Sequence, residues 1–312
     1  MKFGILGWGK IARTQLAPAI LEAGHEIAVV GSREPGAEQI PGLPGVRWRS
    51  YEAVLADSEV DAVYIALPNH LHVPWTLRAL EARKHVLCEK PMALTVAEVD
   101  AVQAAAEQSQ RHMQEAFMVR HHPQWHMLRD LPLGALRSVQ IGFSYDNRDP
   151  ANIRNRADLG GGALWDIGCY AVFAGIWLFG REPDHVRLRA TNHAQWGTDV
   201  HAHGELGWGG DACLQFYVST QSAAHQGVRV LGERGWAELA VPFNAPARVS
   251  VRQCMDGGTS DKATAHELAP VNQYVEMVRA FASTAQEGTA TDLSESRAVA
   301  QTLVRLRHSA GL

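Results

Sequence analysis

A glycine-rich turn near the start of the chain constrains its fold more than any other feature. Residues 7–12 read Gly-Trp-Gly-Lys-Ile-Ala, a G-x-G-x-x-A pattern that follows an apolar strand-like run, Lys2–Leu6, and opens a helix-like run. Gly7 permits a tight turn, Gly9 lets the backbone approach a pyrophosphate, and Ala12 allows close contact between helix and strand. The helix start then presents unpaired N–H groups to an anion. The pattern predicts a dinucleotide-binding turn, with an incidental glycine turn as the alternative.

Alternating strand and helix signals continue beyond this turn. Strand-like runs at Glu26–Val30, Asp61–Ala66 and His85–Leu87 are separated by helix-like segments, and a further helix, Thr95–Gln108, begins with a capping-box pattern. Such alternation implies right-handed crossovers and a parallel sheet. The sequence therefore predicts an α/β Rossmann domain with a mostly parallel sheet over residues 1–119.

A different pattern begins at about residue 120. Several strand-like runs between Val186 and Val251 follow one another without a long helix between them, which predicts a mainly antiparallel sheet. Two helix-like runs, Pro270–Gln286 and Ser294–Arg307, end the chain. We expect residues 120–312 to form an α+β domain with an open sheet, for substrate binding and dimerisation. The C-terminal helices are candidates to pack against the first domain.

The composition of the 312-residue chain excludes several classes of protein. Hydrophobic residues make up 46% and charged residues 20%, which excludes global disorder. A net charge of −4 leaves no basic excess for binding nucleic acid. None of the cysteines forms a CxxC pair, which argues against a disulfide scaffold or zinc knuckle and favours a reducing cytoplasm. The cysteines are Cys88, Cys169, Cys213 and Cys254.

Two further features bear on membranes and metals. The uncharged run Ile167–Gly180 is too short to span a bilayer and predicts a buried helix, and the first residues lack a signal-peptide pattern. We therefore expect a cytoplasmic protein without a membrane partner. His122 and His126 have the spacing of a metal pair, but no acid or cysteine nearby completes a site, so we expect no metal.

The end of the second strand-like run bears on the choice of cofactor. An NAD enzyme usually carries Asp or Glu there, which accepts a hydrogen bond from the ribose 2′-hydroxyl. This chain has Ser32 and Arg33 instead. A serine can donate to a 2′-phosphate and an arginine can grip it or stack beside it, so these residues favour NADP. The alternative is a solvated turn in which Glu34 takes an NAD ribose.

Three later segments carry groups suited to catalysis. Leu67–His72 and Cys88–Pro91 each follow a buried strand-like run, at the strand ends where open α/β sheets bind ligands. Farther along, Gly160–Tyr170 leads into an apolar helix. Asp166 and Tyr170 are four residues apart there, so they share one helix face, and a buried carboxylate and phenol need partners.

Together these segments resemble the Gfo/Idh/MocA oxidoreductase family, and within it the NADP-dependent D-xylose and trans-dihydrodiol dehydrogenases. The matching pieces are Gly7–Ala12, Ala66–His72, Glu89–Pro91, Glu115–Met118, Arg120, Asn152–Arg154 and Gly160–Tyr170. The resemblance implies a Rossmann domain, an open antiparallel sheet whose far face often makes dimers, and a bond before Pro91 that is often cis. It also implies catalytic roles for Lys90, Asp166 and Tyr170, and a place for His72 on the cofactor side.

The chemistry suits these residue types. Hydride transfer at a carbinol carbon needs a proton transferred at its oxygen, and a free tyrosine titrates near ~10, too high for an efficient base at neutral pH. A nearby ammonium favours the phenolate. We predict that Tyr170 is the general acid/base, that Lys90 is its electrostatic partner, and that Asp166 orients substrate hydroxyls or Lys90. The alternative is a core tyrosine and a surface lysine.

The remaining predictions concern the cofactor, the substrate and the assembly. We expect an NADP-dependent oxidoreductase acting on a secondary alcohol or carbonyl of a sugar, cyclitol or related diol. The alternative is a catalytically silent dinucleotide-binding sensor or regulator of the same fold. Pro35–Val46, rich in proline and glycine, is expected to be a loop where relatives have a helix. A homodimer through the open sheet is expected from the resemblance. The predicted cofactor-binding residues are Gly7, Trp8, Gly9, Lys10, Ile11, Ala12, Ser32, Arg33, Leu67, Pro68, Asn69, His72, Glu89, Lys90, Arg120 and Arg154.

Overall fold

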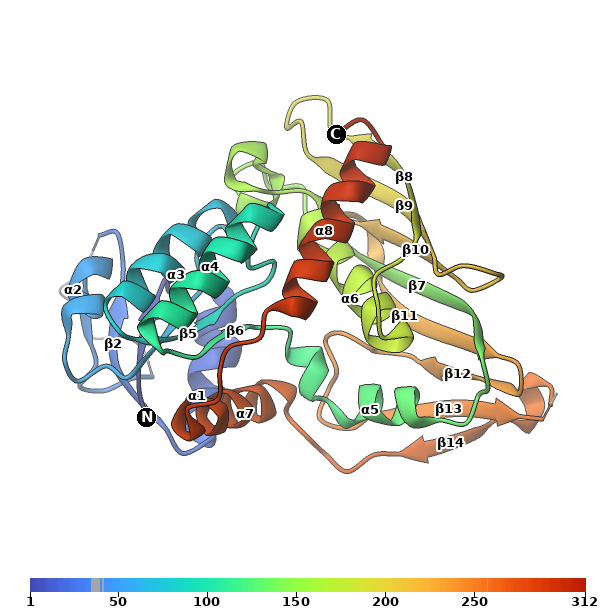
Figure 1. Ribbon diagram of the computed structural model, residues 1–312, viewed down its shortest axis with the longest axis horizontal. Coiled ribbons are helices and arrows are strands. Elements are labelled where there is room, and N and C mark those ends of the chain that lie inside the picture. Colours follow the sequence, from blue (N-terminus) through green and yellow to red (C-terminus); the bar gives the residue numbers. More distant parts are fainter. Residues whose placement is uncertain (35–39, 41, 257) are drawn as a thin grey trace. The chain divides into compact units, whose positions relative to one another are not determined.

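The computed structural model describes residues 1–34, 40, 42–256 and 258–312, and divides into two units (Figure 1). The first unit comprises Met1–His121 and Asn272–Ser296, and the second comprises His122–Val271 and Arg297–Leu312. Much of the loop predicted over Pro35–Val46 lies outside the described residues, because these omit 35–39 and 41. Each unit is built around its own sheet.

Six parallel strands form the sheet of the first unit, in the order β3-β2-β1-β4-β5-β6. Along the chain, β2 and β3 are added on one side of β1, and β4, β5 and β6 are then added on its other side. Open α/β sheets bind ligands at such a reversal point, which here lies at the carboxyl ends of β1 and β4. The parallel sheet confirms the prediction. The strands are β1 Lys2–Leu6, β2 Glu26–Gly31, β3 Arg47–Arg49, β4 Ala62–Ile65, β5 His85–Cys88 and β6 Met113–Glu115.

Helices of the first unit connect these strands and bury their apolar faces. Thr95 and Glu98 form the predicted capping box at the start of α4. Ser50 accepts from the Ala53 N–H at the start of α2, which fixes the turn between β3 and that helix. The helices are a π-helical segment Ala12–Leu16, α1 Ala17–Glu22, α2 Tyr51–Ala56, α3 His72–Glu81, α4 Val96–Ser109 and α7 Gln273–Glu287.

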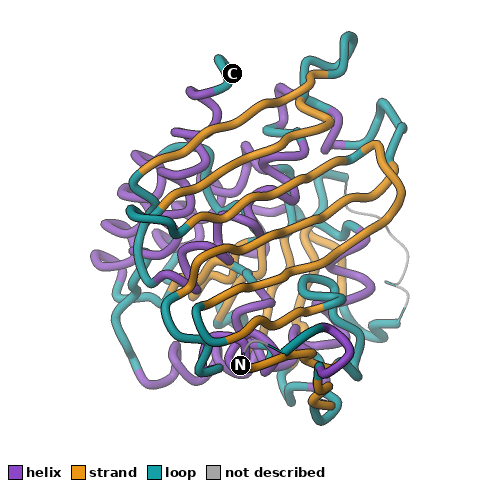
Figure 2. The backbone as a smooth tube through the Cα atoms, turned by 90° about the vertical axis from the view of Figure 1, so that its right-hand side faces the viewer, coloured by secondary structure: helices purple, strands orange, loops and turns teal. Residues whose placement is uncertain are grey.

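Eight strands form the sheet of the second unit, in the order β14-β13-β12-β11-β7-β10-β9-β8 (Figure 2). All neighbouring pairs are antiparallel except β7 and β10, so the prediction of a mainly antiparallel sheet is confirmed. The strands are β7 Leu136–Asp146, β8 His185–Asn192, β9 Asp199–Gly207, β10 Cys213–Ser219, β11 Gln221–Gly232, β12 Gly235–Leu239, β13 Ser250–Met255 and β14 Thr264–Glu267.

One face of this sheet packs on helices, and the other is polar. Val139, Ile141 and Phe143 of β7 are buried, whereas Gln140 between them is exposed. The helices are α5 Pro123–Asp130, a π-helical segment Leu164–Gly168, α6 Cys169–Phe179 and the greater part of α8 Ser294–Ser309. His122 caps α5 by accepting from the Gln124 N–H.

The helical run that ends with α6 is the chain's most apolar segment. By length and composition, the helical run over residues 157–179 could cross a membrane. However, 83% of its most apolar 18-residue stretch is buried inside the protein. Ala171, Val172 and Phe173 are fully buried. The predicted buried helix is therefore present, and it forms the core of the second unit.

Candidate active site

The glycine turn after β1 is shaped for close backbone approach. Gly7 has a φ of +91°, and a Cβ there would lie 2.5 Å from the Ala66 carbonyl oxygen. Its N–H donates to the Gly31 carbonyl oxygen at 3.1 Å, which ties the turn to the end of β2. A Cβ at Gly9 would meet nothing within 4 Å, so the space above it is open. The turn therefore fits a pyrophosphate, because only glycine leaves both the conformation and the room.

Residues around the turn complete this end of the sheet. Ala12 is fully buried against the sheet, Ile11 is half-buried and Lys10 is exposed. The indole of Trp8 meets the ring of Trp48 edge-on, with centroids 6.4 Å apart. Trp48 comes from β3, a strand that the sequence analysis did not predict.

The end of β2 carries Ser32 and Arg33. The Ser32 hydroxyl donates to the Glu34 carbonyl oxygen at 3.2 Å and accepts from the Glu34 N–H at 3.3 Å, forming a local turn. The Ser32 N–H donates to the Arg49 carbonyl oxygen at 2.9 Å. Arg33 is exposed, and its charge opposes the burial that raises the pKa of Tyr51. The charge of Arg33 thus acts on the side chain of Tyr51, the first residue of α2.

His72 lies beneath the loops that follow β4 and β5. Its ring is 1% exposed, and its two nitrogens lie 2.8 Å from the carbonyl oxygens of Leu67 and Pro91. Burial lowers the pKa of His72, whereas these two carbonyls act in the opposite direction. The ring therefore holds both loops in place. Pro68 and Asn69, in the first loop, are half-buried at the surface of this edge.

The loop after β5 carries Glu89 and Lys90. Glu89 accepts from the Tyr64 phenol at 2.6 Å and from the Lys90 N–H at 3.3 Å. Burial, together with the charge of Glu89, raises the pKa of Tyr64 well above its ordinary value. The peptide bond between Lys90 and Pro91 is cis, as the resemblance implies. Lys90 is half-buried at the same sheet edge as the glycine turn.

Glu115 is a second buried carboxyl behind this loop. Its Oε1 accepts from the Met92 N–H at 2.8 Å, and burial raises its pKa to about 7 against the opposing effects of Ser296, Met92 and the charge of Lys90. Burial and the charge of Glu89 also raise the pKa of Tyr274, and the charge of Lys90 partly opposes this rise. Sequence reasoning missed Tyr64, Glu115 and Tyr274 as neighbours of the loop. Of these three residues, only Glu115 carried a signal in the sequence, because it is a charged residue at the end of a buried strand.

Arg120, one of the predicted cofactor-binding residues, lies in a turn beyond the end of β6. β6 ends at Glu115, and the chain then forms a 3₁₀ turn at Met118–His121, in which the Arg120 N–H donates to the Phe117 carbonyl oxygen. The Arg120 guanidinium pairs with Glu295 at 2.7 Å. The tight turn replaces strand pairing because the backbone bonds to itself within three residues.

Asp166 is the centre of a polar cluster in the second unit. Arg154 Nε lies 3.0 Å from its Oδ1, and the Tyr145 phenol donates to its Oδ2 at 2.5 Å. Asp166 is 9% exposed, so these contacts satisfy a buried carboxylate. Tyr145 lies near the end of β7, and no sequence pattern connected it to Asp166. Tyr170 is also buried and packs against Phe143 and Phe243.

The N-terminus of the helix that carries Asp166 and Tyr170 is capped by another buried acid. Asp199, at the start of β9, accepts from the Leu164 N–H at 2.6 Å. Burial raises the pKa of Asp199, while the Leu164 N–H and the charge of Arg307 oppose this. A Cβ at Gly162, whose φ is +123°, would collide with the Asp199 carboxylate. Glycine is therefore required for this cap to form.

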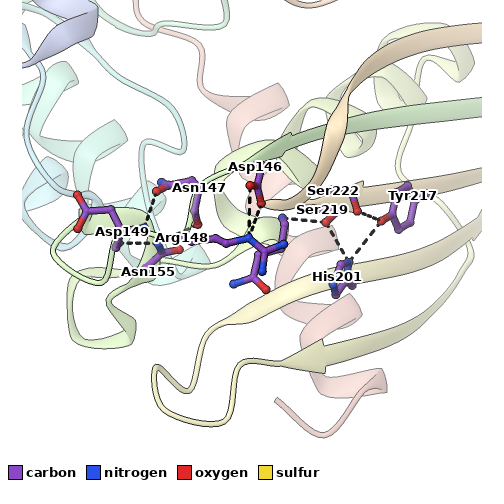
Figure 3. Close-up of polar contacts among 10 residues, drawn as sticks. Asp146, Asn147, Arg148, Asp149, Asn155, His201, Tyr217, Ser219 and Ser222 are labelled. Atoms are coloured by element: carbon purple, nitrogen blue, oxygen red, sulfur yellow. Dashed lines mark hydrogen bonds and ion pairs between the residues drawn. The ribbon is translucent and has the colours of Figure 1, made fainter.

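The loop between β7 and this helix contains paired charges. Arg148 contacts Asp146 at 3.0 Å (Figure 3). Arg156 contacts Asp158 at 2.6 Å. Asn155 is buried and donates to the carbonyl oxygens of Asn147 and Asp149, which fixes the loop. Each of the loop's arginines, Arg154 included, thus lies against a carboxylate.

Profiles of known families match both units. The profile described as "Oxidoreductase family, NAD-binding Rossmann fold" (GFO_IDH_MocA) matches residues 1–117, and the GFO/IDH/MocA C-terminal domain matches residues 125–238. These matches confirm the resemblance that the motifs indicated.

Individual relatives match almost the whole chain. D-xylose 1-dehydrogenase (NADP(+)) 2 of Haloferax volcanii is 35% identical, over 99% of this chain and 97% of the relative. Trans-1,2-dihydrobenzene-1,2-diol dehydrogenase of Xenopus laevis is 28% identical, over 87% of this chain and 83% of the relative. The crystal structure of a 3-ketoreductase from Actinomadura kijaniata, in complex with NADP and TDP-benzene, has a TM-score of 0.91 at 27% identity, covering 99% of this chain and 97% of that one.

Proposed function

Because this chain belongs to the Gfo/Idh/MocA family of oxidoreductases, we propose that it is an NADP-dependent oxidoreductase acting on a secondary alcohol or carbonyl of a sugar, cyclitol or related diol. The observation that carries the proposal is the match, over nearly the full length of both chains, to a D-xylose dehydrogenase named for NADP(+). The 3-ketoreductase that this fold resembles was solved with NADP and a TDP-linked molecule. A nucleotide-linked sugar therefore belongs on the substrate panel beside free sugars.

The first unit supplies the cofactor site in this proposal. The open space above Gly9 and the helix start at Lys10 fit a pyrophosphate. Leu67, Pro68 and Asn69 line the neighbouring strand end. When bound, the nicotinamide supplies or accepts the hydride. The protein's task is then to position the substrate and to move one proton at its oxygen.

We assign the proton transfer to Tyr170, as general acid for reduction and general base for oxidation. Lys90, positively charged, would favour the phenolate form and hold the reacting oxygen. Asp166 already binds Arg154 and Tyr145 through its two oxygens. It would therefore act by fixing these two side chains toward substrate hydroxyls, more than by binding Lys90.

Binding and turnover measurements test this function. Tryptophan fluorescence should report saturable binding of NADP(H), and a panel of aldoses, cyclitols, diols and nucleotide-linked sugars should contain a substrate. Tyr170→Phe and Lys90→Ala should each lower kcat by about 10²-fold or more, with the Kd for NADP(H) nearly unchanged, because general acid–base transfer contributes about that much.

Matched controls remove a phenol and an ammonium elsewhere. Tyr217→Phe, on the polar face of the second sheet, and Lys262→Ala, on an exposed turn, should retain native turnover. Tight cofactor binding without turnover across the panel would contradict the enzyme and favour a sensor. Full activity in Tyr170→Phe and Lys90→Ala would contradict the roles assigned to these residues.

We further propose that two copies pair through the polar face of the eight-stranded sheet, and that the enzyme works in the cytoplasm. This face holds a groove of about 860 Å³ whose lining includes His203, Tyr217, Arg229, Glu238 and Arg252. Charges of both signs alternate across it, since Arg229 and Arg252 flank Glu238 at 3.4 and 3.3 Å. Such a surface is complementary to a copy of itself. The free thiols of all four cysteines suit a reducing compartment.

A further inference from the structure

Arg49 occupies a position that the sequence analysis did not consider. It is the last residue of β3, the edge strand beside β2, and it pairs in register with Gly31. Residues paired across parallel strands point their side chains to the same face, so Arg49 lies on the face toward which a Cβ at Gly31 would point. That Cβ would meet Tyr51 and Val54 of α2. Arg49 therefore lies on the α2 face of the sheet, at its carboxyl edge.

Arg33 lies at the same edge of the sheet. It follows Gly31 by two residues, and its charge acts on Tyr51, the first residue of α2. The hydrogen bond from the Ser32 N–H to the Arg49 carbonyl oxygen holds the ends of β2 and β3 together at 2.9 Å. Two guanidinium groups are thereby brought to one corner of the sheet from residues 16 positions apart in the sequence.

These two charges have no carboxylate against them among the residues that the structure describes. The described ion pairs include neither Arg33 nor Arg49, and Glu52 of the neighbouring helix contacts Arg78 instead. Both arginines are exposed. By contrast, the three arginines of the loop after β7 each contact an acid. The corner is consequently a positive site at the strand end that faces the ribose of a dinucleotide.

The serine at this corner has a limited capacity to bind a ligand. The Ser32 hydroxyl is engaged with Glu34 and its N–H with Arg49, so a phosphate there needs its donors from elsewhere. A guanidinium presents a rigid pair of N–H donors that matches two phosphate oxygens.

We propose that Arg49, together with Arg33, binds the 2′-phosphate of NADP and so sets the preference for NADP over NAD. This inference rests on the proposed function, because it concerns the same dinucleotide site. NAD carries a hydroxyl at that position, which has no charge to attract these side chains. The preference therefore comes from an edge strand as well as from the end of β2.

Fragments of the cofactor test this directly, without catalysis. Calorimetry should show that the native chain binds 2′,5′-ADP more tightly than ADP, which lacks the 2′-phosphate. Arg49→Leu should raise the Kd for 2′,5′-ADP about 10- to 100-fold, the range of a charge-assisted hydrogen-bond pair, and leave the Kd for ADP nearly unchanged. Arg33→Leu should act in the same direction, and Arg49→Lys should restore part of the affinity.

Arg47→Leu is the matched control, since Arg47 is an exposed arginine on the same strand and face, two register pairs farther from the carboxyl edge of the sheet. It should change neither Kd appreciably. The inference is overturned if Arg49→Leu weakens 2′,5′-ADP and ADP equally, leaves both unchanged, or acts no more strongly than Arg47→Leu. A native chain that binds neither NADP nor NAD overturns the proposed function itself. Circular dichroism confirms that each variant is folded.

Discussion

At the scale of single residues, buried polar groups lie directly behind the loop after β5 that carries Lys90. His72 bonds to the carbonyl oxygens of the loops after β4 and β5, and Glu115 accepts from the Met92 N–H. A buried polar group is costly unless it is paired, so each of these groups restricts where the backbone can lie. The position of Lys90 is thus set partly by side chains that never reach the substrate.

Glu115 gives this arrangement a measurable pH dependence. Its pKa rises from 4.5 to about 7 on folding because of burial. The folded state therefore binds the proton more tightly than the unfolded state, and stability falls as pH rises between these values. Glu115→Gln stays neutral while keeping an oxygen for the Met92 N–H. Relative to the native chain, this variant should gain roughly 2–3 kcal/mol in free energy of unfolding between pH 5 and 8.

Urea unfolding at a series of pH values measures this gain. Glu59→Gln serves as the control, because the Glu59 side chain is 70% exposed. The control should show no comparable change with pH. A constant difference between Glu115→Gln and the native chain across pH 5–8 would contradict a neutral, buried Glu115.

At the scale of elements, the helix that carries Asp166 and Tyr170 depends on a distant strand. Its first turn is held by the carboxylate of Asp199 on β9, and Asp166 lies in a π-helical segment before α6 proper. The wider turn departs from the 3.6-residue period that sequence reasoning assumes, and such segments are frequent at functional sites. The orientation of both catalytic candidates therefore follows from the cap and the π segment together.

Asp199→Ala should weaken both stability and activity. Loss of a cap costs about 1–2 kcal/mol, and the helix start is also free to shift, so kcat should fall by about tenfold or more. Thr95→Ala is the matched control, because it removes an equivalent cap from α4, which carries none of the catalytic candidates. Thr95→Ala should lower stability by about 1 kcal/mol without lowering kcat. Equal kcat in the two variants would show that the Asp199 cap is only structural.

At the scale of the whole molecule, the catalytic candidates belong to different units: Lys90 to the first, Tyr170 and Asp166 to the second. The second unit also presents a sheet face without a helix in front of it (Figure 2). Gln140, His203 and Gln215 on this face are exposed. A long exposed sheet face with complementary charges suits pairing with an identical surface, which a twofold axis would provide.

Light scattering after gel filtration tests the dimer. The native protein should have the mass of two chains. Arg229→Glu should lower the measured mass toward that of one chain, because the new carboxylate would repel Glu238 and its symmetry mate across the interface. Arg279→Glu, on α7 of the first unit, should leave the mass unchanged. A native chain of single mass would contradict the proposed pairing.

The sequence by itself determined the fold class and supplied the candidates for the site's central residues. The glycine turn, the alternation of strands and helices, and the segments around Lys90 and Tyr170 are local patterns, since each depends on neighbours a few residues away. β3 escaped prediction because three residues, Arg-Trp-Arg, carry no alternation signal long enough to recognise. Only the tertiary structure brought Tyr145 to Asp166, Asp199 to the Leu164 N–H and Arg49 to the end of β2. These contacts join residues that are 21, 35 and 18 positions apart in the sequence, so side-chain packing and strand register decide them, and neither is encoded in local spacing.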